Sequence, residues 1–423
     1  MVERPLRIGF LTTEYPTSYT GGIGSYVRQM AHTMVKLGHS VCVLLCVSSP
    51  ESFTWDGPVL VHTIGVPEDA SHLPLPLGKR SGVIFARRLA ELAKKHDLDL
   101  LEAPEYLGLT AFLSLVKPAK LRVVVRLHTC ASICRSLNGY HPPSALSRLR
   151  DSAQDWLERR AIETADSVTA ISSATVELTT RMLRLRRNDL LVTPNPVTDL
   201  FFSPATDSPI AAEPIVLFAG RLEWRKGPDL LIKALPAILE RHPRVRFCFV
   251  GGDTNSGPGG TSMHAYLSSL VPGQASARVE FTGFVGPEQL LRRYRESTVC
   301  VFPSRWEGFG LVAAEAMACG KPVVVSDTSG FREVISDKVT GLFAKSEDPE
   351  ALAATINELL CDSRFRQVLG ATARDLAVTR FHSDAVGTSM LGIYRRTIAA
   401  KASRPWYRVS ALRSQGRTKK EPA

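Results

Sequence analysis

The stretch Pro303-Ser304-Arg305-Trp306-Glu307-Gly308-Phe309-Gly310-Leu311, followed by Glu315-Ala316-Met317, decides how this chain folds. It follows the apolar run 299–302, which is predicted as a buried strand, and it leads into a helix predicted to begin near Leu311. Glu307 is therefore expected in the loop after the strand and Glu315 about one turn into the helix. Between them, the backbone amides of Gly310 and Leu311 are suited to an anionic group such as phosphate.

The same alternation of strand and helix extends in both directions from this stretch. Short β-rich runs separated by amphipathic stretches of helix length are typical of doubly wound parallel sheets. In the first half, strands are predicted at 7–14, 40–47, 59–66, 98–104, 122–128, 167–172 and 190–195. In the second half they are predicted at 215–222, 246–252, 278–285, 299–304, 322–327 and 341–345. Helices are predicted at 23–37, 83–95 and 144–163, and another opens at Pro228.

A proline-rich break divides the chain. Prolines at 196, 204, 209 and 214 interrupt any periodicity. The sequence thus predicts two Rossmann-like domains facing a central cleft, at 1–197 and 214–380, with a linker at 198–213. Residues 381–400 are predicted as helix and 401–423 as a disordered tail. Because open sheets of this kind bind ligands beyond the carboxyl ends of their strands, the cleft is expected to hold the site.

Charge and hydropathy bear on location. The chain has 423 residues and a formal net charge of +11, and its last 23 residues hold seven Lys or Arg and one acid. The tail is interpreted as a solvated terminus or, alternatively, as attracted to anionic lipid, where each basic residue contributes about 1 kcal/mol. No apolar run approaches the roughly 20 residues of a spanning helix, and a strand is predicted from Arg7 with no signal peptide before it. The expected location is cytoplasmic, with the inner face of the membrane as the alternative.

Several classes of site lack the residues they need. The turn Gly21-Gly22-Ile23-Gly24 has Val27 where a dinucleotide fingerprint needs its third glycine. The sequence has no GxxxxGK[ST] phosphate loop, no CxxC pair for a zinc site and no nucleic-acid recognition motif. Asp97-Leu98-Asp99 has the spacing of a manganese-binding DxD, but it lies at the amino end of a strand, away from the cleft. It is interpreted as a solvated turn.

Two further groups follow predicted strands at the cleft. Gly22 and its neighbours open the first helix, where backbone amides attract anions; a tight turn is the alternative. Arg221 and Lys226 suit a diphosphate, whose charge they would offset as a divalent ion does in other transferases. Ordinary exposed cations are the alternative there.

Together these motifs resemble those of the family 4 retaining glycosyltransferases of the GT-B fold, which carry the E-x7-E element of Glu307 and Glu315. The likeness runs from Arg7 to about Lys401. It also includes Glu14-Tyr15-Pro16, the GGIG turn, the RLHT segment with His128, Pro194-Asn195-Pro196-Val197, the GRL…KG element, Gly251-Gly252, Thr282-Gly283-Phe284 and Gly320-Lys321-Pro322-Val323-Val324. One departure is Thr328-Ser329-Gly330, where relatives often have paired glycines before the acid corresponding to Glu333.

The resemblance implies a metal-independent, retaining transferase that moves a hexose-type sugar from a nucleotide-diphosphate donor and needs no cofactor. In the donor site, Gly22 would bind the distal phosphate, and Arg221 and Lys226 would hold the diphosphate beside the amides of Gly310 and Leu311.

Other roles follow from the same likeness. Glu315 would bind the ribose, and Glu307 would hold hydroxyls of the transferred sugar. His128 would lie near the anomeric carbon, and the backbone near Phe284 would recognise the base. The helix at 381–400 would cross back to the N-terminal domain.

The acceptor stays open at this level. The helix at 83–95 carries Arg87, Arg88, Lys94 and Lys95 beside apolar residues, so it is predicted either to lie on an anionic membrane or to pack as an ordinary amphipathic helix. A lipid-linked or cell-envelope glycan is the first hypothesis for the acceptor, and a small soluble sugar or metabolite is the second. A non-catalytic nucleotide-sugar-binding protein is a third alternative, against which every motif position holds a competent residue.

Overall fold

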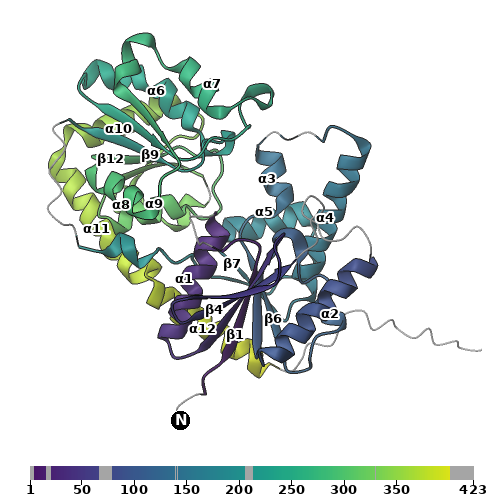
Figure 1. Ribbon diagram of the computed structural model, residues 1–423. Helices are drawn as coiled ribbons and strands as arrows, with labels where there is room; N and C mark the ends of the chain where they lie inside the picture. Colours follow the sequence, from purple (N-terminus) through teal and green to yellow (C-terminus); the bar gives the residue numbers. More distant parts are fainter. Residues whose placement is uncertain are drawn as a thin grey trace, which may run out of the picture.

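Two α/β halves make up the described part of the chain (Figure 1). The computed structural model describes residues 4–15, 21–65, 79–138, 140, 142–204, 213–328 and 330–400. Each half is built on one mostly parallel sheet, as the alternating pattern predicts. The predicted tail at 401–423 and residues 205–212 of the predicted linker lie outside the described residues.

The first sheet has the strand order β3-β4-β2-β1-β5-β6-β7-β8, and only β3 runs antiparallel to its neighbour. Every strand predicted in this half is confirmed, most with a shorter carboxyl end. The strands are β1 (Arg7–Thr12), β2 (Ser40–Val47), β3 (Ser52–Asp56), β4 (Val59–Gly65), β5 (Leu100–Pro104), β6 (Arg122–Leu127), β7 (Ser167–Ala170) and β8 (Leu190–Val192).

Strand β3 is the one that the sequence does not predict. It is an edge strand whose Phe53 and Trp55 are 50% and 70% exposed, so it lacks the buried apolar run that marks the other strands. Its last residue, Asp56, accepts hydrogen bonds from Arg28 Nε at 2.7 Å and from the Tyr15 hydroxyl at 2.8 Å. These bonds attach the edge strand to the first helix and to the end of β1.

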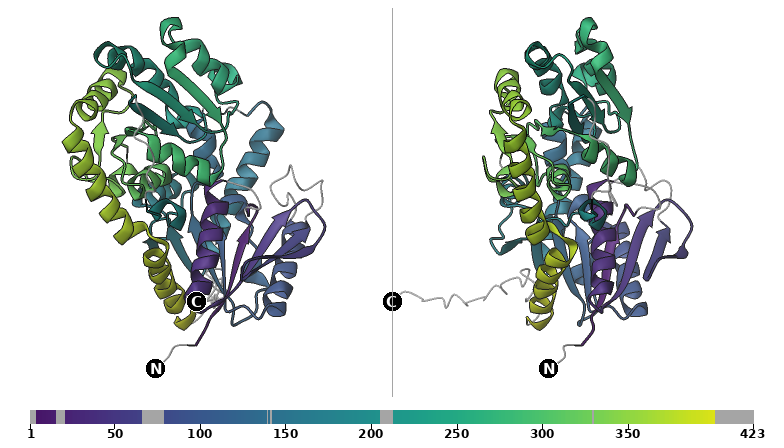
Figure 2. Two further views of the ribbon diagram at one scale, coloured as in Figure 1. Left: turned by 60° about the vertical axis from the view of Figure 1, so that its left-hand side comes forward. Right: turned by 90° about the vertical axis from the view of Figure 1, so that its left-hand side faces the viewer.

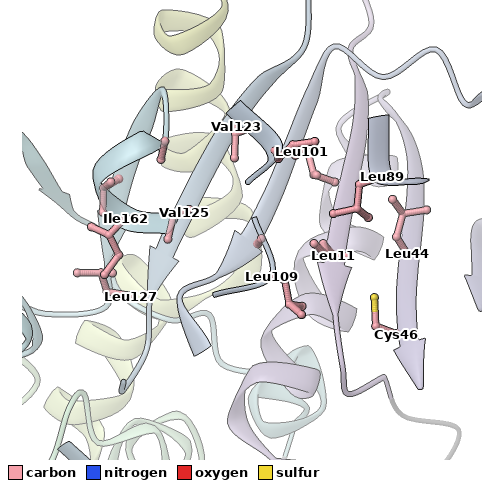
Figure 3. Packing of buried hydrophobic residues seen from close by; sticks show 14 of the residues in the cluster. Leu11, Leu44, Cys46, Leu89, Leu101, Leu109, Val123, Val125, Leu127 and Ile162 are labelled. Atoms are coloured by element: carbon pink, nitrogen blue, oxygen red, sulfur yellow. The ribbon is translucent and has the colours of Figure 1, made fainter. Parts of the chain in front are cut away.

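Helices cover both faces of this sheet (Figure 2). One face carries the apolar cluster drawn in Figure 3, which includes Leu11, Leu44, Leu101 and Val125 and is covered partly by Leu89. The other face is covered by α1 and α12. The helices of this half are α1 (Gly22–Lys36), α2 (Lys79–Lys95), α3 (Ala131–Leu137), α4 (Ala145–Thr164) and α5 (Ser173–Leu183), with short 3-10 turns η2 (Tyr106–Gly108) and η3 (Leu113–Leu115).

The second sheet is fully parallel, with the order β11-β10-β9-β12-β13-β14. Its strands are β9 (Ile215–Ala219), β10 (Arg246–Val250), β11 (Val279–Gly283), β12 (Val299–Phe302), β13 (Val323–Ser326) and β14 (Leu342–Ala344). Around it lie α6 (Pro228–Arg241), α7 (Met263–Leu270), α8 (Pro287–Glu296), α9 (Leu311–Ala318), α10 (Pro349–Cys361) and α11 (Ser363–Phe381), with 3-10 turns η4 (Asp199–Phe202), η5 (Trp224–Lys226), η6 (Pro258–Gly260), η7 (Gly273–Arg278) and η8 (Phe331–Glu333).

The strand orders decide where ligands bind. In the first sheet the chain leaves β1 toward β2 on one side and later returns to β5 on the other. In the second sheet β9 has the same place, between β10 and β12. Such switch points leave a crevice beyond the carboxyl ends of the central strands, which is where open α/β sheets bind their ligands.

Two segments connect the halves. The start of the predicted linker is not irregular: Asp199–Phe202 form η4, because Phe201 is buried against Tyr294 of the second half, with ring centroids 5.7 Å apart. The last described helix, α12 (Ser383–Ala399), lies against α1 of the first half. There Tyr394 donates a hydrogen bond of 2.6 Å to the buried Glu102. No helix among the described residues is both long and apolar enough to cross a membrane.

Candidate active site

The sequence-predicted site residues follow strands near both switch points. In the first half, Gly22 begins α1 after β1, and His128 follows β6. In the second half, Arg221 follows β9 and Glu307 follows β12. The fold therefore places all four at carboxyl ends of strands.

A pocket of about 550 Å³ lies between the halves. Tyr26 and Gln29 of α1 line it on one side, and Leu311 and Glu315 of α9 line it on the other. This volume is within the range of pockets that hold small-molecule ligands. Two predicted donor-site residues thus face α1 across a space of ligand size.

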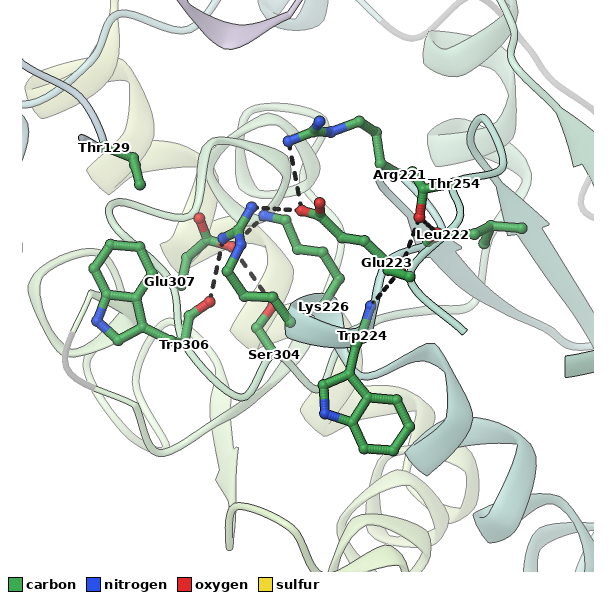
Figure 4. Close-up of polar contacts among 12 residues, drawn as sticks. Thr129, Arg221, Leu222, Glu223, Trp224, Lys226, Thr254, Ser304, Trp306 and Glu307 are labelled. Carbon is green, nitrogen blue, oxygen red and sulfur yellow. Dashed lines mark hydrogen bonds and ion pairs between the residues drawn. The ribbon is translucent and has the colours of Figure 1, made fainter. Parts of the chain in front are cut away.

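Lys226 and Glu307 form a buried ion pair in the second half, where Glu307 lies in the loop that leads into α9 (Figure 4). The Nζ atom of Lys226 lies 2.5 Å from Oε2 of Glu307, and the two side chains are only 16% and 9% exposed. A cation and a carboxylate from two separate motifs, 81 residues apart, therefore meet in one place.

A glycine makes this meeting possible. Gly227 has φ +65°, and a Cβ atom there would lie 2.1 Å from the carbonyl oxygen of Pro303. Only glycine lets η5 approach the end of β12 this closely. Burial lowers the pKa of Lys226 although Glu307 opposes the shift. Burial also opposes ionisation of Glu307, but Lys226 and Arg225 hold its pKa below the usual value.

Arg221 and Arg225 differ sharply in exposure. The Arg221 side chain is 66% exposed, and its Nη2 lies 3.5 Å from Oε1 of Glu223. Arg225 is buried, with its Nη2 2.5 Å from the same Glu223 oxygen and its Nη1 donating to the carbonyl of Trp306 at 3.3 Å. Arg221 is thus accessible to a ligand, whereas Arg225, which the sequence reasoning passed over, holds the Glu307 loop to η5.

The turn into α9 depends on Gly310. Its φ is +94°, and a Cβ atom there would lie 2.7 Å from the ring of Phe331. Leu311 is the first residue of α9. Because the cap residue is Gly310, it has no side chain that could bond to the backbone amides of the first turn. The helix N-terminus beside Glu307 therefore offers backbone amides and positive partial charge to an anion.

The loop of Glu307 is also attached to the first half. Trp306 is buried within the apolar cluster of the N-terminal domain. The carbonyl of Gly308 accepts hydrogen bonds from the hydroxyls of Ser172 and Thr175, at the start of α5. Each half thus contributes to the position of the donor-side acid.

Glu333 follows the segment 328–330, in which this chain differs from the family pattern, and it also contacts the first half. Its Oε1 accepts the backbone amides of Ser173 at 2.7 Å and Ala174 at 3.2 Å. Gly330 passes directly beneath the Glu307 loop, since a Cβ atom there would lie 2.0 Å from the Glu307 carbonyl oxygen. Ser329, where relatives have a glycine, lies outside the described residues.

Glu315 is buried on α9 and receives a hydrogen bond of 3.0 Å from the Tyr294 hydroxyl. Burial raises the pKa of Glu315 to about 7, and the bond from Tyr294 opposes that rise. A carboxylate in this setting gains from further hydroxyl donors, because each one stabilises its charged form.

The helix start at Gly22 is not crowded by the described residues. A Cβ atom on Gly22 would meet none of them within 4 Å, and no acidic residue lies in the first turn of α1. At Gly21, a Cβ atom would lie 2.9 Å from Oε2 of Glu14, so the chain passes closely over that side chain. The amides at the start of α1 can therefore receive an anion.

His128 is buried, and its ring meets the ring of Tyr26 edge-on with centroids 5.1 Å apart. Burial and the nearby Arg126 hold its pKa well below the usual range, so the imidazole is neutral. Arg126 itself is fully buried and donates to the carbonyl of Pro194 at 2.9 Å and to Oδ1 of Asn195 at 3.1 Å. The signal for this buried position was an arginine between Val125 and Leu127 in an otherwise apolar part of the strand, and the sequence-based prediction did not use it.

The remaining predicted residues lie apart from the ion pair. Phe284 follows β11 and is 57% exposed. Asp97 is exposed as predicted, but Asp99 corrects the interpretation as a solvated turn. Its carboxylate is buried, because it accepts the Arg7 backbone amide at 3.0 Å and pairs with Arg4 at 2.9 Å at the amino end of the sheet.

Both halves match known glycosyltransferase families. Residues 21–196 match the glycosyl transferase 4-like domain, and residues 206–376 match the glycosyl transferases group 1. An uncharacterized glycosyltransferase of Methanocaldococcus jannaschii is 35% identical over 185 residues, which is 43% of this chain and 45% of that protein. A D-inositol 3-phosphate glycosyltransferase of Nocardiopsis dassonvillei is 28% identical over 91% of this chain and 92% of its own length.

Solved structures show the same architecture. Sucrose-phosphate synthase from Thermosynechococcus elongatus matches with a TM-score of 0.74 and 25% identity over 93% of this chain and 99% of its own. The HepE protein of Anabaena, solved in complex with UDP-glucose, matches with a TM-score of 0.65 and 21% identity over 92% and 100%. The predicted GT-B fold is thereby confirmed, and with both halves matched in order the chain belongs to the family 4 glycosyltransferases.

Proposed function

We propose that this glycosyltransferase moves a hexose-type sugar from a nucleotide-diphosphate donor to an acceptor hydroxyl, with retention at the anomeric carbon and without a metal ion. The observation that carries the proposal is the buried pair of Lys226 and Glu307 beside the start of α9, in the same half as the exposed Arg221, with α1 facing α9 across a pocket. This arrangement combines fixed positive charge for a diphosphate with an acid for sugar hydroxyls.

The donor is assigned to these groups as follows. Lys226, Arg221 and the amides at Gly22, Gly310 and Leu311 hold the diphosphate. Glu315 accepts hydrogen bonds from the ribose, and the backbone beside Phe284 meets the base. Relatives support a nucleotide sugar as the donor, because the HepE structure contains UDP-glucose.

Catalysis depends mainly on stabilising the negative charge of the leaving diphosphate. As the glycosidic bond to the diphosphate breaks, negative charge builds on the leaving oxygen, where Lys226 and Arg221 stabilise it. Glu307 holds hydroxyls of the sugar, and the neutral His128 lies at the anomeric side. The acceptor hydroxyl then attacks the short-lived oxocarbenium ion from the face that the nucleotide leaves and gives its proton to the departing diphosphate oxygen, so that the configuration is retained.

A donor panel tests the proposal directly. One or more nucleotide-diphosphate sugars should raise the melting temperature, because a ligand that binds only the folded state stabilises it by mass action. Transfer from that donor should continue in excess EDTA and yield a product with the donor's anomeric configuration, as measured by NMR. Loss of transfer in EDTA, or an inverted product, would contradict the proposal.

For the acceptor we propose a lipid-linked or cell-envelope glycan. Leu146, Leu149 and Trp156 lie on one stripe of α4 and are 54%, 62% and 46% exposed, and Arg148 and Arg150 on the same turns are exposed. An apolar stripe with basic residues suits an anionic membrane surface. A small soluble acceptor is the second candidate, favoured by the D-inositol 3-phosphate named for the Nocardiopsis dassonvillei relative.

Vesicle flotation separates the two acceptors. The full chain should float with vesicles that contain phosphatidylglycerol and stay behind with neutral ones. Leu149→Asp should weaken flotation several-fold, whereas Val368→Asp, which changes a side chain 59% exposed on α11, should not. A wild-type chain that ignores anionic vesicles favours the soluble acceptor.

A further inference from the structure

The turn that carries His128 is held by its backbone. It runs from the end of β6 at Leu127 to the start of α3 at Ala131. Both carboxylate oxygens of Glu105 lie 2.9 Å from the His128 backbone nitrogen and accept its N–H. Glu105 follows directly after β5, so one switch-point strand fixes the turn after the next strand.

A second carboxylate holds the other end of the turn. Glu158 on α4 accepts the backbone N–H of Ala131 with Oε2 at 3.0 Å. Its Oε1 accepts the N–H of Leu107 at 3.1 Å and the side-chain amide of Gln154 at 3.0 Å. Glu158 thus connects α4, η2 and the His128 turn through one group.

Close packing brings the two acids together. Gly108 in η2 has φ +60°, and a Cβ atom there would lie 2.4 Å from the backbone of Leu157. Only glycine allows η2 this near α4, which sets Glu158 beside the residues that follow β5. Glu105 and Glu158 are both 0% exposed.

This arrangement is costly for stability alone. Burial raises the pKa of Glu105 to about 8 and that of Glu158 to about 7, and the charge of Glu158 raises the pKa of Glu105 further. Apolar residues of similar volume stabilise a core at least as well as buried charged groups do. A pair of buried acids aimed at one turn therefore points to a need for that turn's geometry.

We propose that Glu105 and Glu158 are positioning residues that fix the backbone of the His128 turn and so keep its imidazole at the reacting end of the site. The inference rests on the proposed function, because it assumes that His128 acts there. Among the described residues, each acid acts on the turn through a backbone amide, Glu105 through that of His128 and Glu158 through that of Ala131. A displacement of about 1 Å at a reacting group costs about 10²-fold in rate.

Glutamine variants test the role while keeping the size of the side chain. In Glu158→Gln, one oxygen becomes an NH₂ group that cannot accept the amide of Ala131 or Leu107. In Glu105→Gln, one of the two oxygens that accept the His128 N–H becomes an NH₂ donor facing that N–H, so the two-oxygen contact is reduced to one oxygen and the turn must shift. Each variant should lower kcat by about 10- to 100-fold with the KM for the donor within about twofold, because most of the proposed donor-binding residues lie in the other half and neither acid bonds to them.

The matched control is a carboxylate at the opposite end of β6, the strand that leads into the His128 turn. Asp166 accepts the N–H of Val123, at the start of β6, with its Oδ2 at 2.7 Å. Asp166→Asn should lower the melting temperature and leave kcat unchanged. Gln154→Ala keeps both acids and removes only a donor to Glu158, so it should cause a smaller loss of kcat even if the glutamine variants fold poorly.

The outcomes distinguish the positioning role of Glu105 and Glu158 from the catalytic role of His128. Near-normal kcat in folded Glu105→Gln and Glu158→Gln overturns the inference, as does an equal kcat loss in Asp166→Asn, which would indicate general strain in β6. His128→Ala is measured alongside. If it keeps its turnover, the catalytic role of His128 in the proposed function is wrong; if it loses turnover while the glutamine variants do not, only the positioning role is wrong.

Discussion

Replacing Lys226 by alanine should lower kcat at saturating donor by about 10²- to 10³-fold, the loss typical of removing one group that stabilises charge in a transition state. The reason is the position of its side chain, which is 16% exposed and whose Nζ lies 2.5 Å from Oε2 of Glu307. In this setting water screens its charge poorly, so its effect on a departing diphosphate is large.

The same change should destabilise the fold, because it leaves Glu307 buried without its nearest cation. Breaking a buried pair in this way typically costs about 3–5 kcal/mol. The double variant Lys226→Ala with Glu307→Gln removes the unpaired charge, so it should regain melting temperature without regaining turnover. Steady-state kinetics and thermal unfolding of both proteins measure the two effects separately.

Arg221 provides a comparison with Lys226, because both are proposed to bind the donor diphosphate. Its side chain is 66% exposed, so Arg221→Ala should change stability by no more than about 0.5 kcal/mol while lowering kcat. Lys233→Ala, which breaks an ion pair with Asp229 on α6, should leave kcat unchanged. Near-normal turnover in both Arg221→Ala and Lys226→Ala would show that other groups stabilise the leaving diphosphate.

Glu307→Gln should lower kcat by about 10²-fold and also move its dependence on pH. Burial already lowers the pKa of Lys226, and Glu307 is the main group that opposes this shift. Without the carboxylate, the pKa of Lys226 falls further. Because the lysine holds a diphosphate only when protonated, the alkaline fall in kcat should begin at lower pH in the variant.

The measurement is a profile of kcat against pH for wild type and variant at saturating donor. Glu280→Gln is the matched control, since Glu280 on β11 pairs with Arg293 at 2.7 Å on the partly exposed side of the second sheet. Its profile should follow the wild type. An unchanged alkaline fall in Glu307→Gln would mean that the ion pair does not control the charge of Lys226.

Much of this site could be predicted from local sequence because its parts follow buried strands. The apolar runs before Arg221 and Glu307 marked those strands, and glycines marked the helix starts at Gly22 and Gly310. Strand β3 could not be found in this way, since Phe53 and Trp55 face solvent and the strand is held by pairing with β4 and by the bonds of Asp56, which lie outside its own sequence pattern.

What local pattern could not provide is contact between distant segments. The bonds of Glu105 and Glu158 to the His128 turn join residues 23 and 27 positions away, and nothing in either segment alone indicates them. The ion pair of Lys226 with Glu307 spans 81 positions. Resemblance to a family gave each residue a role in the same site, but it predicted neither the bond between them nor how deeply they are buried.

The attachment of the Glu307 loop to the first half limits how the enzyme can be re-engineered. Trp306 belongs to the core of the N-terminal domain, and Gly308 is bonded by Ser172 and Thr175. A chimaera that joins this second half to the first half of another transferase would lose the apolar residues that pack around the indole ring of Trp306. Exchanging donor specificity between relatives therefore requires that the start of α5 be grafted together with the donor domain.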